Sequence, residues 1–238
     1  RPSDLGHSDD GFALPALRMH DHVVPMDEAT TRAAGRLFAD DAMTLAEQRA
    51  VKRATIDRRA ALAADLVRGD GPALIWCELN DEGDALAAAI PDAVQVAGAD
   101  DSEDKTERLI GFAEGKYRVM ISKPGIAGFG LNWQHCRTMV FVGPSHSYEQ
   151  TYQAIRRCWR FGQTQPVDVH VVRTDADGQI VQNMRRKEAD AARMSAEMTA
   201  HVGDAVRLAV TGTQREWNPY TPAVKMRVPA WLRREAAA

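Results

Sequence analysis

The chain has 238 residues, of which 45% are hydrophobic and 26% charged, so it can build a core as one large domain or two small ones. Its 30 Lys and Arg against 33 Asp and Glu give a formal net charge of -3, which excludes a globally basic nucleic-acid binder but permits a local basic patch. No apolar run approaches the roughly 18 residues of a membrane span. Three scattered cysteines without CxxC spacing predict no disulfide framework and no metal site, and favour a reduced, cytoplasmic compartment.

Two segments are expected ahead of the main domain. Residues 1–26 mix Gly, Pro, Asp and His without clear periodicity, which predicts a connector or an edge segment. Residues 27–71 have a helical composition, and Thr44 with Glu47 makes a capping-box pattern that predicts two helices. We interpret these helices as an arm that packs on a neighbouring domain. The chain starts at Arg1 without a signal segment, so we expect a piece of a longer protein.

Residues 72–202 change to short apolar runs that alternate with helical stretches. The runs predict strands at 73–77, 93–97, 118–122, 138–142 and 167–173. The helical stretches lie at 82–90, 103–114, 148–160 and 179–201. This alternation is typical of an α/β fold with a parallel sheet covered on both faces. Residues 203–238 repeat Pro, Trp and Gly without period and predict an irregular C-terminal extension.

Three glycines directly follow the third of these strands, at Gly125, Gly128 and Gly130. With Lys123 beside them, their backbone amides can approach a nucleotide phosphate or a sugar-phosphate backbone. Their order, G-x-x-G-x-G, differs from the G-x-G-x-x-G of dinucleotide-binding folds, and the chain has no G-x-x-x-x-G-K-[ST] P-loop. Taken alone, the pattern is equally typical of an ordinary glycine turn.

A second candidate site is a predicted helix that starts after Ser147 and stops at Gly162. One face, expected to bury against the sheet, carries Tyr148, Tyr152, Ile155 and Trp159. The other face carries Gln153, Arg156, Arg157 and Arg160. Its like-charge pairs cost about 0.2–0.5 kcal/mol each, which a solvated face can tolerate. We favour the alternative, in which a polyanion such as a nucleotide triphosphate completes the site.

In this order the motifs resemble those of superfamily-two helicases. The sixth motif of that family is similar to Q-x-x-x-R-x-x-R-x-G-Q at residues 153–163, and the final Gly-Gln is characteristic of the Swi/Snf-type branch. Residues 127–132 are similar to the fifth motif, and residues 73–77 to the fourth. The nearest match is the Swi/Snf-type DEAD/DEAH-box helicases of phage and bacterial genomes. The resemblance implies a RecA-like three-layer α/β/α sandwich, the second lobe of a two-lobed motor.

In this family ATP and Mg²⁺ are held mainly by the first lobe, and the second lobe adds arginines to the γ-phosphate. By position, the resemblance makes Arg160 the arginine finger and Arg157 its partner. Gln153 would order the attacking water or couple the two sites, and Gly130 and Asn132 would approach the ribose or the phosphates. The chain has no P-loop lysine and no DEAH-like acid, so it is expected to be inactive without the first lobe.

The resemblance also implies a track for DNA. Ser122, Lys123 and Gly125 would touch the phosphodiester backbone, a contact that carries no sequence information. The expected partners are thus the N-terminal lobe of the same protein and DNA, without a membrane. Two other functions stay open. One is a non-catalytic nucleic-acid- or protein-binding module that keeps the fold. The other is an unrelated α/β cofactor enzyme, against which the glycine order argues.

Overall fold

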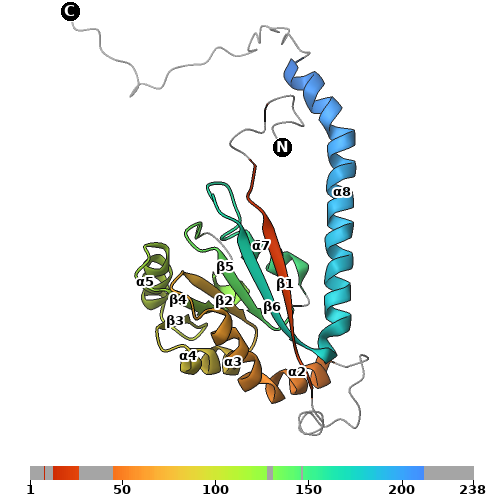
Figure 1. Ribbon diagram of the computed structural model, residues 1–238. Coiled ribbons are helices and arrows are strands. Elements are labelled where there is room, and N and C mark those ends of the chain that lie inside the picture. The colour runs from red at the N-terminus through yellow and green to blue at the C-terminus, as the bar shows by residue number, and fades with distance from the viewer. Residues whose placement is uncertain (1–7, 9–12, 27–44, 128–130, 146, 212–238) are drawn as a thin grey trace, which may run out of the picture.

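The computed structural model describes residues 8, 13–26, 45–127, 131–145 and 147–211. Within these ranges six parallel strands form one sheet in the order β1-β6-β5-β2-β4-β3 (Figure 1). The strands are β1 (Leu17–Val24), β2 (Ala73–Cys77), β3 (Ala93–Val96), β4 (Val119–Ser122), β5 (Thr138–Val142) and β6 (Val167–Thr174). All five predicted strands are confirmed to within a residue, and so is the parallel sheet.

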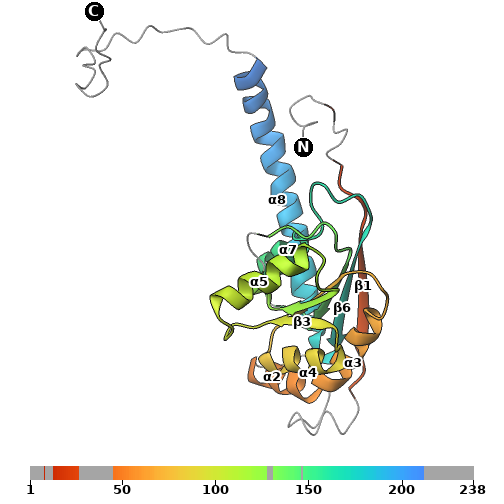
Figure 2. The ribbon, with the colours of Figure 1, turned by 90° about the vertical axis from the view of Figure 1, so that its left-hand side faces the viewer.

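Helices cover both faces of this sheet, as Figure 2 shows. On one face α3 (Ile56–Leu66) and α4 (Asn80–Ala89) pack on inward side chains of the central strands. On the other face α5 (Ser102–Ala113) and α7 (Tyr148–Ile155) enclose a second core. There Phe112 meets Trp133 edge to face, with ring centroids 5.6 Å apart. The expected RecA-like three-layer α/β/α sandwich is therefore the fold of the chain.

The segments ahead of residue 72 belong to this same body. β1 pairs with β6 along its whole length, so the predicted connector contains an edge strand of the sheet. Ala63 of α3 is fully buried against the strands, because the apolar stripe of this helix has a sheet face of its own chain to cover. The predicted arm therefore contributes α3 to one helical layer of the sandwich. Residues 27–44, including the predicted cap Thr44, lie outside the described residues.

The last described helix, α8 (Gly178–Thr211), is longer than predicted. It follows a short 3₁₀ turn, η2 (Asp175–Asp177), and extends away from the sandwich (Figures 1 and 2). The prediction of an irregular extension from residue 203 onward is therefore wrong for residues 203–211, which are helical. Residues 204–210 continue the helical composition, and Gly203 costs only about 1 kcal/mol in a helix interior. None of the helices in the described ranges has the length and apolarity to cross a bilayer.

Parallel strands bring the carboxyl ends of β2, β4 and β5 to one edge of the sheet. β2 lies between the other two, so the chain moves to opposite sides of it as it continues. In open α/β sheets, ligands bind in the crevice outside such a switch point. α2 (Leu45–Ala54) and the single-turn α6 (Pro124–Ala127) lie at this edge, because residues of both line the cleft described below.

Candidate functional site

The arginine segment begins as predicted but leaves the helix early. Ser147 caps α7, since its Oγ accepts the Gln150 N–H at 3.3 Å. The helix ends at Ile155, and the Arg157 and Cys158 amides then donate to carbonyls only three residues earlier, those of Ala154 and Ile155, both at 3.2 Å. The predicted helix through residue 160 is therefore wrong. The cause is tertiary, because the Arg157 carbonyl accepts the Trp133 N–H at 2.9 Å.

This turn separates the arginines that helical spacing had placed on one face. The Arg156 guanidinium lies over the rings of Tyr152 and Trp159, 6.0 and 5.3 Å from their centroids. Of the predicted aromatic face, Ile155 is buried, but Tyr152 is 42% exposed. That face does not bury fully against the sheet, and Arg156 belongs with its rings rather than with the other two arginines.

Arg157 and Arg160 form a cationic corner with the end of the glycine loop. Arg157 is only 8% exposed and donates to the Leu131 carbonyl at 2.9 Å. Arg160 is partly exposed and donates to the side-chain oxygen of Asn132. Burial, and secondly the nearby Arg160 charge, lower the pKa of Arg157. The structure therefore brings together three of the predicted nucleotide-binding residues, Asn132, Arg157 and Arg160.

The cationic corner contains hydrogen-bond donors that have no acceptor among the described residues. The Nε atoms of Arg157 and Arg160 are both buried without a hydrogen-bond partner among the described residues. In the same ranges no carboxylate forms an ion pair with either side chain. Buried donors and uncompensated positive charge are costly, and an anion would satisfy both. The corner can thus bind a phosphate-like group.

Two of the predicted nucleotide-site residues are not placed in this corner. Gln153 is half-buried on α7, and no contact in the described ranges joins it to the arginines. Gly130 lies outside the described residues. The roles expected for both stay predictions.

Gln163 holds the corner together, a role that the sequence pattern did not reveal. Its side-chain nitrogen donates to the Gln134 carbonyl at 2.8 Å, and it also lies within reach of two further carbonyls. Its side-chain oxygen accepts the N–H groups of Thr164 and Gln165 at 3.0 and 3.1 Å. The residue thereby ties the arginine turn to the segment after Leu131. The only sequence feature that pointed to Gln163 is its position as the last residue of the pattern that resembles the sixth motif.

A cleft of about 410 Å³ opens at the carboxyl edge of the sheet. Lys123 and Gly125, two of the residues predicted to contact nucleic acid, line it. The Lys123 ammonium donates to the Asn80 side chain at 2.6 Å, and a Cβ at Gly125 would meet open space among the described residues outside its own helix turn. Ser122 does not face the cleft: it is 1% exposed, and its Oγ donates to the Val96 carbonyl at 3.0 Å. The contact predicted for Ser122 is therefore wrong, because the neighbouring strand uses its hydroxyl.

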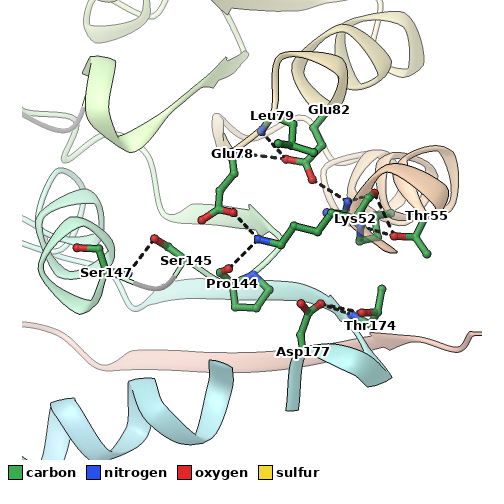
Figure 3. A network of polar contacts seen from close by, with 11 residues as sticks. Lys52, Thr55, Glu78, Leu79, Glu82, Pro144, Ser145, Ser147, Thr174 and Asp177 are labelled. Carbon is green, nitrogen blue, oxygen red and sulfur yellow. Dashed lines mark hydrogen bonds and ion pairs between the residues drawn. The ribbon is translucent and has the colours of Figure 1, made fainter. Parts of the chain in front are cut away.

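A further wall of the cleft comes from α2, for which the sequence predicts only an arm that packs on a neighbouring domain. Arg49 is exposed there, and Lys52 is almost buried. Lys52 pairs with Glu78 and donates to the Pro144 carbonyl at 3.2 Å (Figure 3). The signal for this wall was the spacing of Arg49 and Lys52, since side chains three residues apart share a helix face. Cys77 also lines the cleft, but burial raises its pKa to about 12, so its thiol stays protonated.

Behind this wall Arg59 and Glu82 form an ion pair at 2.7 Å that is closed to solvent. Glu82 also accepts the N–H groups of Glu78 and Leu79 at 2.9 and 3.0 Å (Figure 3). The pair therefore fixes the turn after β2 that contributes Glu78 to the cleft. In the described part of the chain, no group of three or more His, Cys, Asp or Glu side chains is arranged to hold a metal ion.

Comparison with known proteins agrees with this architecture. Residues 59–162 match the family model of the helicase conserved C-terminal domain. The C-terminal part of the Fun30 ATPase domain is similar in structure, with a TM-score of 0.56 and 14% identity over 72% of this chain and 90% of that one. The C-terminal domain of the DEAD-box protein Dbp5 gives a TM-score of 0.50 and 13% identity, over 75% and 87%. No curated protein sequence matches the chain. Residues 59–162 thus match a domain that is typical of ATP-dependent helicase lobes, and the two solved structures share the RecA-like fold.

Proposed function

We propose that the chain is the second motor lobe of an ATP-dependent DNA helicase or translocase of the Swi/Snf type, from the phage and bacterial branch. The observation that carries this proposal is the cationic corner, in which Arg157 and Arg160 keep buried donors without a partner among the described residues. Such a corner suits the γ-phosphate of a nucleotide presented by another lobe. A helicase C-terminal domain is the setting in which that presentation is expected.

Each residue of the corner has a distinct role in this proposal. Arg160 is the arginine finger that stabilises negative charge as the phosphoryl bond breaks, and Arg157 supports it from its buried position. Asn132 holds Arg160 in place until the phosphate takes over its guanidinium. Gln153 and Gly130 remain proposed contributors to the attacking water and to the ribose. Mg²⁺ and most of the phosphate contacts belong to the first lobe, so the lobe alone does not hydrolyse ATP.

The cleft at the carboxyl edge is the proposed track for the DNA backbone. Lys123 provides the positive charge, and Gly125 lets a phosphate approach the backbone closely. Arg49 of α2 adds a second cation to the lining of the cleft. Contacts of this kind position a strand without reading its sequence.

Fluorescence anisotropy with a labelled single-stranded and a labelled double-stranded DNA of mixed sequence tests this track. Lys123→Ala should weaken binding on every sequence and make its salt dependence shallower. Lys116→Ala is the matched control, since Lys116 is exposed, pairs with Glu114 and lies outside the cleft. Unchanged affinity and salt slope for Lys123→Ala would remove the track from this cleft. DNA binding without DNA-stimulated ATP hydrolysis in the two-lobed protein would favour a non-catalytic binding module.

A further inference from the structure

The proposed arginine finger lies in a stretch of chain that the hydrophobic core holds only at its start. Cys158 is fully buried, and Trp159 packs against the core while partly buried. Phe161, the residue after the finger Arg160, is 61% exposed, and the next buried residue is the polar Gln163. Apolar packing therefore fixes the chain as far as Trp159 but not beyond it.

Residues 160–163 form a tight turn beyond this point. The Gln163 backbone N–H donates to the Arg160 carbonyl at 3.0 Å, and Gly162 has a φ of +94°. A positive φ at the third position of a four-residue turn favours glycine there. The turn defines the backbone of the finger, so the direction in which the finger points depends on what the turn is attached to.

Two glutamine side chains attach this turn to the segment that follows Asn132. The Gln134 side-chain nitrogen donates to the Phe161 carbonyl at 3.2 Å. The Gln163 side-chain nitrogen donates in return to the Gln134 carbonyl at 2.8 Å. Each glutamine side chain thus binds the backbone of the other segment. The turn is held close to Asn132, whose side chain accepts from Arg160.

We propose that Gln134 is a positioning residue for the arginine finger, an assignment that rests on the proposed role of Arg160. Gln163 is less suited to a test, because it is only 9% exposed and also accepts two backbone N–H groups beyond the turn. Gln134 is partly exposed, and the hydrogen bond that its side chain donates goes to the turn. Removing this side chain should therefore shift the finger without unfolding the protein, and a shift of about 1 Å can cost up to about 10²-fold in rate.

Steady-state ATP hydrolysis by the two-lobed protein with DNA tests this role. Gln134→Ala should lower kcat about tenfold and leave KM for ATP within about twofold, because a misplaced finger weakens binding of the transition state but not of ATP. Gln165→Ala is the matched control. The Gln165 side chain is also exposed, but it accepts a hydrogen bond from Arg137 and does not contact the turn.

A double-mutant cycle separates positioning from a structural effect. If Gln134 acts through Arg160, Gln134→Ala should bring no further loss in an Arg160→Ala background in single-turnover reactions. Multiplied losses, an unchanged kcat for Gln134→Ala, or an equal loss for Gln165→Ala would overturn the proposal. Parental activity of Arg160→Ala would instead refute the arginine finger itself, and the positioning role with it.

Hydrogen exchange of the 238-residue chain gives a measurement that does not depend on hydrolysis. The Gln163 backbone N–H should exchange at least about fivefold faster in Gln134→Ala than in the parent, because the turn is then less firmly held. The Trp133 N–H, which donates to the Arg157 carbonyl, should exchange at the parental rate, and the melting temperature should change by less than about 2 °C. An unchanged rate for Gln163 would show that Gln134 does not hold the turn, whether or not the motor function is correct.

Discussion

Breaking the buried ion pair between Arg59 and Glu82 should destabilise the whole fold. Arg59 and Glu82 are 0% and 1% exposed, with 2.7 Å between their charged atoms. Arg59 also donates to the Thr55 hydroxyl at 3.0 Å and to the Lys52 carbonyl at 2.6 Å. Arg59→Met keeps most of the volume of the side chain but removes every donor. Glu82 is then left as a buried charge without its partner.

The contacts set the size of this effect. Two lost hydrogen bonds to neutral acceptors cost about 1 kcal/mol each, and stranding the carboxylate brings the total for Arg59→Met to about 3–5 kcal/mol. In the Glu82→Gln background Arg59 already lacks its carboxylate, so Arg59→Met removes an unpaired buried charge there instead of creating one. The same substitution should then cost at most about 1–2 kcal/mol, a coupling of at least about 2–3 kcal/mol between the two positions.

Urea unfolding followed by circular dichroism measures all four members of this cycle. The midpoint of Arg59→Met should fall while the slope stays constant, which indicates lost stability rather than a changed unfolded state. Arg68→Met is the control, because its ion pair with Asp65 is exposed and should change stability by less than about 1 kcal/mol. A loss below about 1 kcal/mol for Arg59→Met, or additive costs in the cycle, would refute the reasoning.

Three further predictions concern the arginine finger, pH and a strained glycine. In the two-lobed protein, Arg160→Ala should lower DNA-stimulated ATP hydrolysis about 10³-fold or more, whereas Arg156→Ala, whose guanidinium lies over aromatic rings, should change it little; equal losses would remove the finger role. Burial, and then two neighbouring histidines, lower the pKa of His170 from 6.5, so its contribution to stability is complete above pH 6.5 and is lost as the pH falls below it. The melting temperature should therefore drop less on acidification to about pH 5.5 in His170→Gln than in the parent, and parallel curves would contradict this. Gly143→Ala should cost about 1–3 kcal/mol in chemical unfolding, because φ is +92° and a buried guanidinium nitrogen lies 3.2 Å from the new Cβ. Gly115→Ala, with φ +78° and open space, should cost only about 1 kcal/mol, and the reverse order would contradict the steric argument.

Continuous apolar runs predicted the central strands well because those strands are buried on both faces. β2 is buried at every position, and its sequence A-L-I-W-C has no polar side chain to interrupt the pattern. The search for continuous apolar runs did not find β1, because β1 is an edge strand that is only partly buried. It carries Arg18, His20 and His22 on one face. Its polar composition is typical of a loop, and only the pairing partner β6 makes it a strand.

In the candidate site, too, local sequence patterns predicted some positions, whereas tertiary contacts decided others. The order of motifs predicted that the fifth and sixth motifs meet, and in the structure Arg157 contacts Leu131 and Arg160 contacts Asn132. Helical periodicity failed for these arginines, because a hydrogen bond from Trp133, a residue distant in sequence, ends the helical pattern. Ser122 failed for a related reason, since a carbonyl of the neighbouring strand takes its hydroxyl. Both misplacements come from partners that no local sequence window contains.

The cleft and the cationic corner are built from the two ends of one segment. Lys123 begins this segment in the cleft, and Leu131 and Asn132 end it against the two arginines. Gln163 joins the chain beyond Asn132 to the arginine turn, because its side-chain nitrogen donates to the Gln134 and Cys158 carbonyls. If DNA binds beside Lys123 and ATP binds beside the two arginines, as we propose, the two binding sites are joined by a segment of only about ten residues. Coupling between them then does not need to pass through the hydrophobic core. On that proposal, a bound strand that moves Leu131 or Asn132 would alter the hydrogen bonds that hold both guanidinium groups, and DNA would then change the position of the proposed arginine finger.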